Sequence, residues 1–127
     1  MNYLVDTHVL LWAAEESPRL SRNAQKLMND AKSVLYFSVA SIWEISIKRG
    51  LGRSDFQVEP QQLRRGLMRS GWKEIAISSE HAIATLNLPP LHKDPFDRLL
   101  LAQAYVEGYT LLTSDKIVAK YPGAVRV

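Results

Sequence analysis

The chain has no cysteine and no long hydrophobic run. The absence of cysteine excludes disulfides and thiolate metal sites, and it is consistent with a reducing cytoplasm. No apolar run approaches the roughly 20 residues that a membrane-spanning helix needs. The first residues lack the basic segment of a signal peptide, and Asp6 interrupts the only apolar stretch there. We therefore expect a cytoplasmic protein without a membrane span.

Several common catalytic motifs are also absent. The six glycines are isolated, so the chain has neither a phosphate-binding loop nor a dinucleotide fingerprint. No serine lies in a Gly-x-Ser-x-Gly nucleophile motif. The histidines have no spacing typical of a zinc site, and we interpret them as solvated or hydrogen-bonded residues whose roles the sequence leaves open: His8, His81 and His92.

Hydrophobic patterning predicts one α/β domain over residues 1–127. Short apolar or β-branched runs predict strands over residues 2–6, 34–38, 72–77 and 109–113, with a short edge strand over 125–127. Helical segments separate these strands. This alternation is typical of a parallel sheet that is covered by helices on both faces.

Capping residues predict several helix boundaries. Thr7 is expected to cap a helix that runs to about Ala14. The helix after the second strand is expected to stop at Gly50, as the residue that follows its last turn. Asp94 is expected to cap a helix whose first residue is a proline and which ends at Gly108.

Four acidic residues interrupt or border apolar segments. Asp6 ends one predicted strand, Asp115 follows another, Glu44 interrupts an apolar helix, and Asp97 lies in the first turn of a further helix. Acids are seldom buried unless they are paired or bind a metal. The carboxyl ends of parallel strands meet at one edge of a sheet, where ligands bind. Four converging carboxylates would suit Mg²⁺ or Mn²⁺.

Each acid also has a purely structural interpretation. Asp6 is a favoured helix cap, and Asp115 suits an ordinary turn. Glu44 is the third residue of a capping-box pattern that starts at Ser41. Asp97 shares its helix start with Asp94, but Asp94 already has the capping role, so Asp97 is the better candidate ligand.

Basic residues are concentrated in residues 48–73. The formal net charge is +3, and a basic body around an acidic pocket suits a polyanionic substrate. The sequence leaves two interpretations of this segment open, a solvated helix face or a rim that binds RNA. The candidate rim residues are Arg64, Arg65 and Arg69.

Four segments resemble, in order, the motifs of PIN-domain proteins, especially the VapC-like toxins of type II toxin–antitoxin pairs. The segments span nearly the whole chain, and they are residues 3–12, 38–45, 94–104 and 111–115. The resemblance implies a three-layer α/β/α sandwich with a parallel sheet of four or five strands, and a metal-dependent endoribonuclease. It implies the metal ligands Asp6, Glu44, Asp97 and Asp115.

The same resemblance implies an RNA substrate, Mg²⁺ or Mn²⁺ as cofactor, inhibition by a small antitoxin protein and a homodimer. Thr7 and Thr113 stand beside candidate ligands and could orient them. Two other functions stay open. One is a catalytically silent nucleic-acid-binding regulator. The other is an Asp-dependent phosphatase, although position 8 holds His where such an enzyme would have a second Asp.

Overall fold

The computed structural model describes residues 1–127, which form five strands that alternate with helices. The elements, in which η marks a 3₁₀ turn, are β1 (Asn2–Val5), α1 (Thr7–Ala14), α2 (Arg22–Asn29), β2 (Val34–Ser38), α3 (Val39–Gly50), α4 (Pro60–Arg69), β3 (Lys73–Ile75), α5 (Ser79–Ala84), η1 (Thr85–Asn87), α6 (Pro95–Glu107), β4 (Thr110–Thr113), η2 (Val118–Lys120) and β5 (Ala124–Arg126). All strand pairs are parallel, in the order β3-β2-β1-β4-β5.

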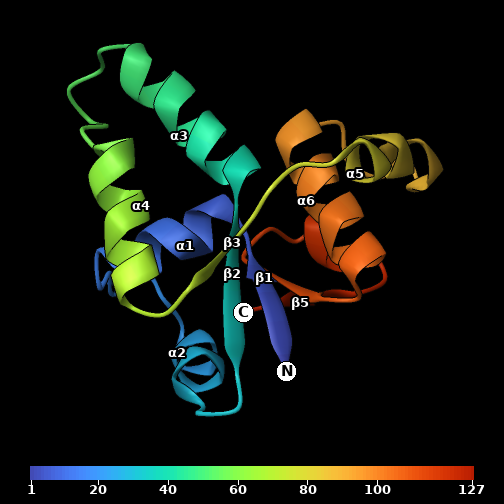
Figure 1. The fold of residues 1–127 in the computed structure, drawn as a ribbon, viewed down its shortest axis with the longest axis horizontal. Helices are drawn as coiled ribbons and strands as arrows, with labels where there is room; N and C mark the ends of the chain where they lie inside the picture. Colours follow the sequence, from blue (N-terminus) through green and yellow to red (C-terminus); the bar gives the residue numbers. More distant parts are fainter.

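Alternate residues of the central strands face two separate cores. Tyr3 and Val5 of β1 pack with α1, α3 and α4, whereas Leu4 packs with α6. In Figure 1, α1 to α4 lie on one side of the sheet and α5 and α6 on the other. Both faces of the sheet are therefore covered, which confirms the predicted three-layer α/β/α architecture. No helix has the length and apolar character that a bilayer span requires.

The structure confirms the cap of α6 and corrects two other predicted boundaries. Asp94 accepts hydrogen bonds from the first turn of α6, and Gly108 follows the helix with a left-handed φ of 73°. Asp6, not Thr7, caps α1, because β1 ends at Val5 and Asp6 is the last extended residue. Gly50 is still helical, and the positive φ occurs at Gly52.

Candidate active site at the carboxyl ends of the strands

Asp6 combines a capping role with a place at the end of the central strand. Its Oδ1 accepts a hydrogen bond of 2.9 Å from the amide of Val9, and its Oδ2 accepts one from the hydroxyl of Thr113. Burial raises the pKa of the Asp6 carboxyl, and these two hydrogen bonds oppose the rise. The structural interpretation of Asp6 is thus correct, and the same side chain borders the candidate site.

Asp115 follows β4, the neighbour of β1 in the sheet. Its amide donates to Thr113 Oγ1 at 3.0 Å. Its Oδ1 accepts from the amides of Ile117 and Val118, at 2.7 and 3.1 Å, which fixes the turn before η2. These bonds leave Oδ2 without a donor from another residue. Asp115 is therefore held rigidly while one of its oxygens stays available for a ligand.

Asp97 lies in the first turn of α6, where Asp94 takes the capping bonds. Its Oδ2 lies 2.7 Å from Nε2 of His92, and its side chain is 26% exposed. Burial, together with repulsion from Asp94 and Asp6, raises the pKa of Asp97 to about 6, and the contact with His92 opposes this rise. Asp97 is thus a carboxylate whose charge the fold leaves poorly compensated.

Glu44 accepts a hydrogen bond from Thr7, the residue after Asp6, but it is not among the residues whose ligand atoms lie within 4.8 Å of one another. Thr7 Oγ1 lies 2.7 Å from Glu44 Oε1 and 2.9 Å from Ser41 Oγ. Because Ser38 caps α3, the capping-box interpretation of Glu44 is wrong. The buried Thr7 thus contacts the Glu44 carboxylate, and its role in orienting a metal ligand stays a prediction.

Three ligand-bearing side chains converge most closely at this edge of the sheet. One ligand atom from each of His92, Asp97 and Asp115 lies within 4.8 Å of the other two. Asp6 is close enough to Asp97 for its charge to raise the pKa of that carboxyl. Sequence reasoning gave His92 no role. The one signal that could have indicated it is its position five residues before Asp97, in the proline-containing loop that enters α6.

The loop that carries His92 is fixed by two side chains. The phenol oxygen of the buried Tyr121 accepts from the amides of Leu91 and His92 and donates to the carbonyl of Pro89. The guanidinium of Arg98 donates to the carbonyls of Pro89 and His92. These hydrogen bonds hold the backbone of His92 in the position from which its side chain contacts Asp97.

The donor set fits a divalent cation. Asp97 and Asp115 each have one carboxylate oxygen without a donor from another residue, and carboxylate oxygens suit Mg²⁺ and Mn²⁺. A bound cation would also offset the repulsion that raises the pKa of Asp97.

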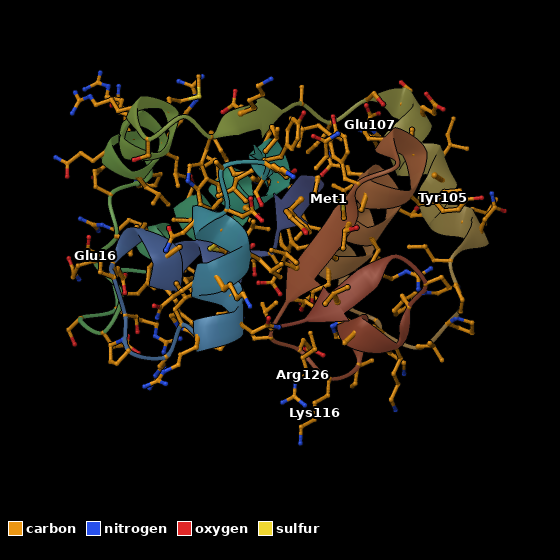
Figure 2. All side chains as sticks on the ribbon, turned by 90° about the horizontal axis from the view of Figure 1, so that it is seen from below. Met1, Glu16, Tyr105, Glu107, Lys116 and Arg126 are labelled. Carbon is orange, nitrogen blue, oxygen red and sulfur yellow. The ribbon has the colours of Figure 1, made fainter.

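Basic residues lie in two different places relative to this edge. Arg64, Arg65 and Arg69 are exposed on α4, and Arg64 forms a salt bridge of 2.7 Å with Glu74. Lys116 directly follows Asp115, and Arg126 is in register with Thr113 on β5, so both belong to the edge that carries the carboxylates. Figure 2 shows Lys116 and Arg126 projecting outward at one edge of the molecule. Sequence reasoning missed both residues: Lys116 could have been found from its position next to Asp115, whereas Arg126 reaches this edge only through the pairing of β4 with β5.

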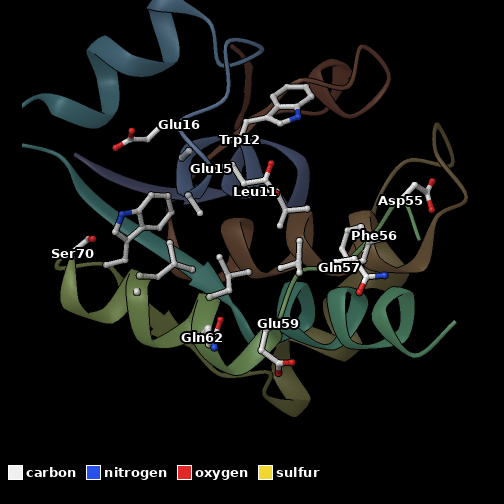
Figure 3. A pocket seen from close by; sticks show the side chains of 17 residues that line it. Leu11, Trp12, Glu15, Glu16, Asp55, Phe56, Gln57, Glu59, Gln62 and Ser70 are labelled. Carbon is white, nitrogen blue, oxygen red and sulfur yellow. The ribbon is translucent and has the colours of Figure 1, made fainter. Parts of the chain in front are cut away.

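A hollow lies away from this edge, between α1, α4 and residues 55–59. It has a volume of about 850 Å³, and Figure 3 shows side chains of these three segments around it. Leu11, Trp12 and Phe56 are among its apolar residues. All of its charged residues are acidic: Glu15, Glu16, Asp55 and Glu59. Figure 2 shows Glu16 on the opposite side of the molecule from Tyr105 of α6.

Comparisons with known proteins agree with this geometry. The family model described as PIN domain matches residues 3–124. The chain belongs to the PIN-domain family. No curated protein has a sequence that matches this chain.

Solved structures show the same fold over the full PIN domain. VapBC2 from Rickettsia felis bound to a promoter DNA fragment has a TM-score of 0.71 at 18% identity, over 100% of this chain and 98% of that one. A toxin–antitoxin complex from Klebsiella pneumoniae has a TM-score of 0.67 at 23% identity, over 97% and 95%. VapC20 from Mycobacterium tuberculosis, a sarcin–ricin loop cleaving toxin, has a TM-score of 0.62 at 15% identity, over 98% of this chain and 99% of that one.

Proposed function

We propose that this PIN-domain protein is a metal-dependent endoribonuclease and the toxin of a type II toxin–antitoxin pair. The observation that carries the proposal is the convergence of Asp97 and Asp115 beside the buried Asp6, at the carboxyl ends of the central parallel strands. Family membership and likeness to structures of VapBC complexes support it. Membership alone does not decide activity, because one fold can host several functions.

The carboxylates have distinct roles in this proposal. Asp97 and Asp115 offer free oxygens to Mg²⁺ or Mn²⁺. Asp6 and Glu44 are the remaining proposed ligands. Thr113 donates a hydrogen bond to Asp6, and Thr7 donates one to Glu44. A divalent ion held there supplies Lewis-acid chemistry, which neutralises phosphate charge and makes water nucleophilic at neutral pH. The hydrolysis requires no nucleophilic side chain, and the site offers no serine or cysteine suited to that task.

Basic residues at the same edge would hold the RNA backbone. We assign Lys116 and Arg126 to phosphates that flank the scissile one, since both are exposed beside the carboxylates. The rim predicted from sequence at Arg64, Arg65 and Arg69 rests on charge alone, and Glu74 already neutralises part of it. A single-stranded or looped segment is the proposed substrate, because its phosphates can enter the pocket.

The groove between α1 and α4 is the proposed docking site of the antitoxin. Its apolar lining and its acids, of which Asp55 already pairs with Arg53, suit a segment that carries both apolar and basic side chains. An Arg or Lys of the same partner that reached the carboxylates would block the site, since guanidinium groups pair well with carboxylates. The proposed partner is therefore a small protein with a basic amphipathic segment.

A separate surface suits the homodimer. Trp43, Ile47 and Leu51 recur every fourth residue along α3, and their exposed fractions are 57%, 44% and 64%. Side chains at this spacing share one face of a helix, and an exposed apolar stripe marks an association surface. The stripe is distinct from the antitoxin groove, so a dimer could bind two antitoxin segments.

One experiment separates the proposed function from its alternatives. The purified protein is incubated with Mn²⁺ and either an RNA pool or small phosphate monoesters. An endoribonuclease cuts the RNA and leaves the monoesters intact. Release of phosphate from monoesters would indicate a phosphatase, and RNA binding without cleavage would indicate a silent regulator. Slower growth on expression, relieved by the gene of the antitoxin, would support the toxin assignment.

A further inference from the structure

His92 combines two features that the other histidines lack. Its Nε2 lies 2.7 Å from Asp97, and it belongs to the one group of side chains whose ligand atoms lie within 4.8 Å of one another. By contrast, His81 is buried between the amide of Ser78 and the carboxylate of Glu107, and His8 is exposed beside Trp12. Of the three histidines, His92 is therefore the one placed to bind the same metal ion as Asp97 and Asp115.

We propose that His92 is a nitrogen ligand of the divalent ion, and that it makes the site prefer Mn²⁺ to Mg²⁺. The inference rests on the metal centre of the proposed function, but it goes beyond the four carboxylates that the PIN-domain resemblance implies. It assigns to this chain a mixed nitrogen and oxygen donor set built from His92, Asp97 and Asp115.

The separations fit this donor set. Ligand atoms at about 2.0–2.2 Å from one ion lie roughly 3 Å apart when adjacent and at most about 4.4 Å apart when opposite. The pair His92–Asp97, at 2.7 Å, is already near the adjacent spacing, and the whole group needs only a small contraction from its 4.8 Å limit. Ion binding would thus require little rearrangement of the site.

The backbone of His92 supports ligation because it is braced on both sides. Its amide donates to the phenol oxygen of Tyr121 at 2.8 Å, and its carbonyl accepts from Arg98 at 3.2 Å. Nδ1 has no hydrogen-bond partner in the protein, so it can carry the ring proton while Nε2 offers its lone pair. Binding at Nε2 releases a proton if that nitrogen carried it before.

Metal preference follows from ligand chemistry. Mg²⁺ favours hard oxygen ligands and keeps much of its water, whereas imidazole suits first-row transition ions. A second interpretation is that His92 only orients Asp97 through its hydrogen bond. Under that interpretation His92 is a positioning residue, and its loss should weaken Mg²⁺ and Mn²⁺ binding to the same extent.

The test uses the full chain, stripped of metal, and three proteins: the wild type, His92→Asn and the matched control His8→Asn. Mn²⁺ binding is titrated by EPR, Mg²⁺ is measured by competition, and pulsed EPR of the Mn²⁺ complex reports coupling to nitrogen. We expect nitrogen coupling in the wild type and the control and its loss in His92→Asn. We expect Mn²⁺ binding of that variant to weaken about tenfold or more, with little change for Mg²⁺.

Two results would overturn the inference: no nitrogen coupling in the wild type, or an equal loss of both metals in His92→Asn. RNA cleavage measured on the same samples keeps the two proposals apart. Cleavage with a Mn²⁺ ion that shows only oxygen ligands overturns the role of His92 and leaves the ribonuclease in place. Nitrogen coupling in a protein that cuts no RNA supports the role of His92 and overturns the proposed function.

Discussion

Thr113 donates a hydrogen bond from its hydroxyl to Asp6 Oδ2, across 107 positions of sequence. The hydroxyl oxygen of Thr113 in turn accepts a hydrogen bond of 3.0 Å from the amide of Asp115. One buried hydroxyl therefore connects two acids that follow the neighbouring strands β1 and β4. The parallel pairing of these strands makes this contact possible, and the contact fixes the acids with respect to each other.

Removal of that hydroxyl should damage both stability and metal binding. Thr113→Val keeps the side-chain volume but leaves a buried oxygen of Asp6 without its donor, which should cost about 1–3 kcal/mol of unfolding free energy. Mn²⁺ affinity should fall because Asp6 and Asp115 lose their shared support. The control is Thr110→Val on the same strand, whose hydroxyl makes no hydrogen bond to another side chain. Equal results for the two variants, by denaturant unfolding and Mn²⁺ titration, would refute this role of Thr113.

Asp97→Asn should stabilise the metal-free protein at neutral pH. The pKa of Asp97 is raised to about 6 in the fold, above its ordinary value of 3.8. Between these values the folded protein binds more protons than the unfolded chain, so the unfolding free energy falls as pH rises from about 4 to about 6. The loss amounts to at most roughly 3 kcal/mol. Asp94 keeps α6 capped in the variant.

The pH profile provides the measurement. In EDTA, the difference in unfolding free energy between Asp97→Asn and the wild type should be small near pH 4 and reach a plateau in favour of the variant above about pH 6. The variant should also lose most of the stabilisation that Mn²⁺ gives the wild type. A variant that is less stable at every pH would show that Asp97 serves mainly as a structural residue.

Charge reversal should distinguish the two candidate RNA-binding surfaces. The combined changes Lys116→Glu and Arg126→Glu should weaken RNA binding and flatten its salt dependence. RNA that makes fewer phosphate contacts releases fewer counterions when it binds. Arg65→Glu with Arg69→Glu should have the smaller effect, since these residues lie on α4 and not on the edge that carries the carboxylates. Arg22→Glu with Lys26→Glu on α2 provides a control of equal charge change. A larger loss of RNA binding in the α4 variant would support the RNA-binding rim predicted from the sequence.

The antitoxin groove can be tested without disturbing catalysis. Phe56→Ala removes a half-buried aromatic ring from the groove and should weaken antitoxin binding by tenfold or more, about 1.4 kcal/mol, while RNA cleavage is unchanged. Leu86→Ala is the control, because Leu86 is 83% exposed and lies outside the groove. Calorimetric titration of each variant with the purified antitoxin gives both affinities. Unchanged affinity of Phe56→Ala would place the antitoxin elsewhere.

The parts of the fold with local sequence signals were predictable. Three local features delimit α6: Asp94 accepts from its first amides, the following proline has no N–H that needs a partner, and Gly108 takes the left-handed conformation that ends it. The choice between Asp6 and Thr7 was wrong because both suit a cap, and the end of β1 decides between them. The capping-box interpretation of Glu44 was wrong because β2 runs directly into α3, so that Ser38 and not Ser41 caps the helix.

The parts of the site that depend on distant contacts were not predictable. His92 reaches the carboxylates because Tyr121, 29 positions later, holds its amide. Arg126 reaches the same edge because β5 pairs with β4. The roles of Asp6, Glu44, Asp97 and Asp115 as metal ligands stay predictions, although the structure places Asp97 and Asp115 together.

We expect one divalent-metal site both to stabilise this protein and to enable it to cut RNA. The most direct measurement is a Mn²⁺ titration of EDTA-treated protein in which RNA cleavage and melting temperature are followed together. We expect no cleavage without metal, and a parallel rise of both quantities with a common midpoint. At about 100 times the dissociation constant the ion should add roughly 2.7 kcal/mol, which is several degrees of melting temperature. Full cleavage in metal-free buffer would show that this protein cuts RNA without a divalent ion.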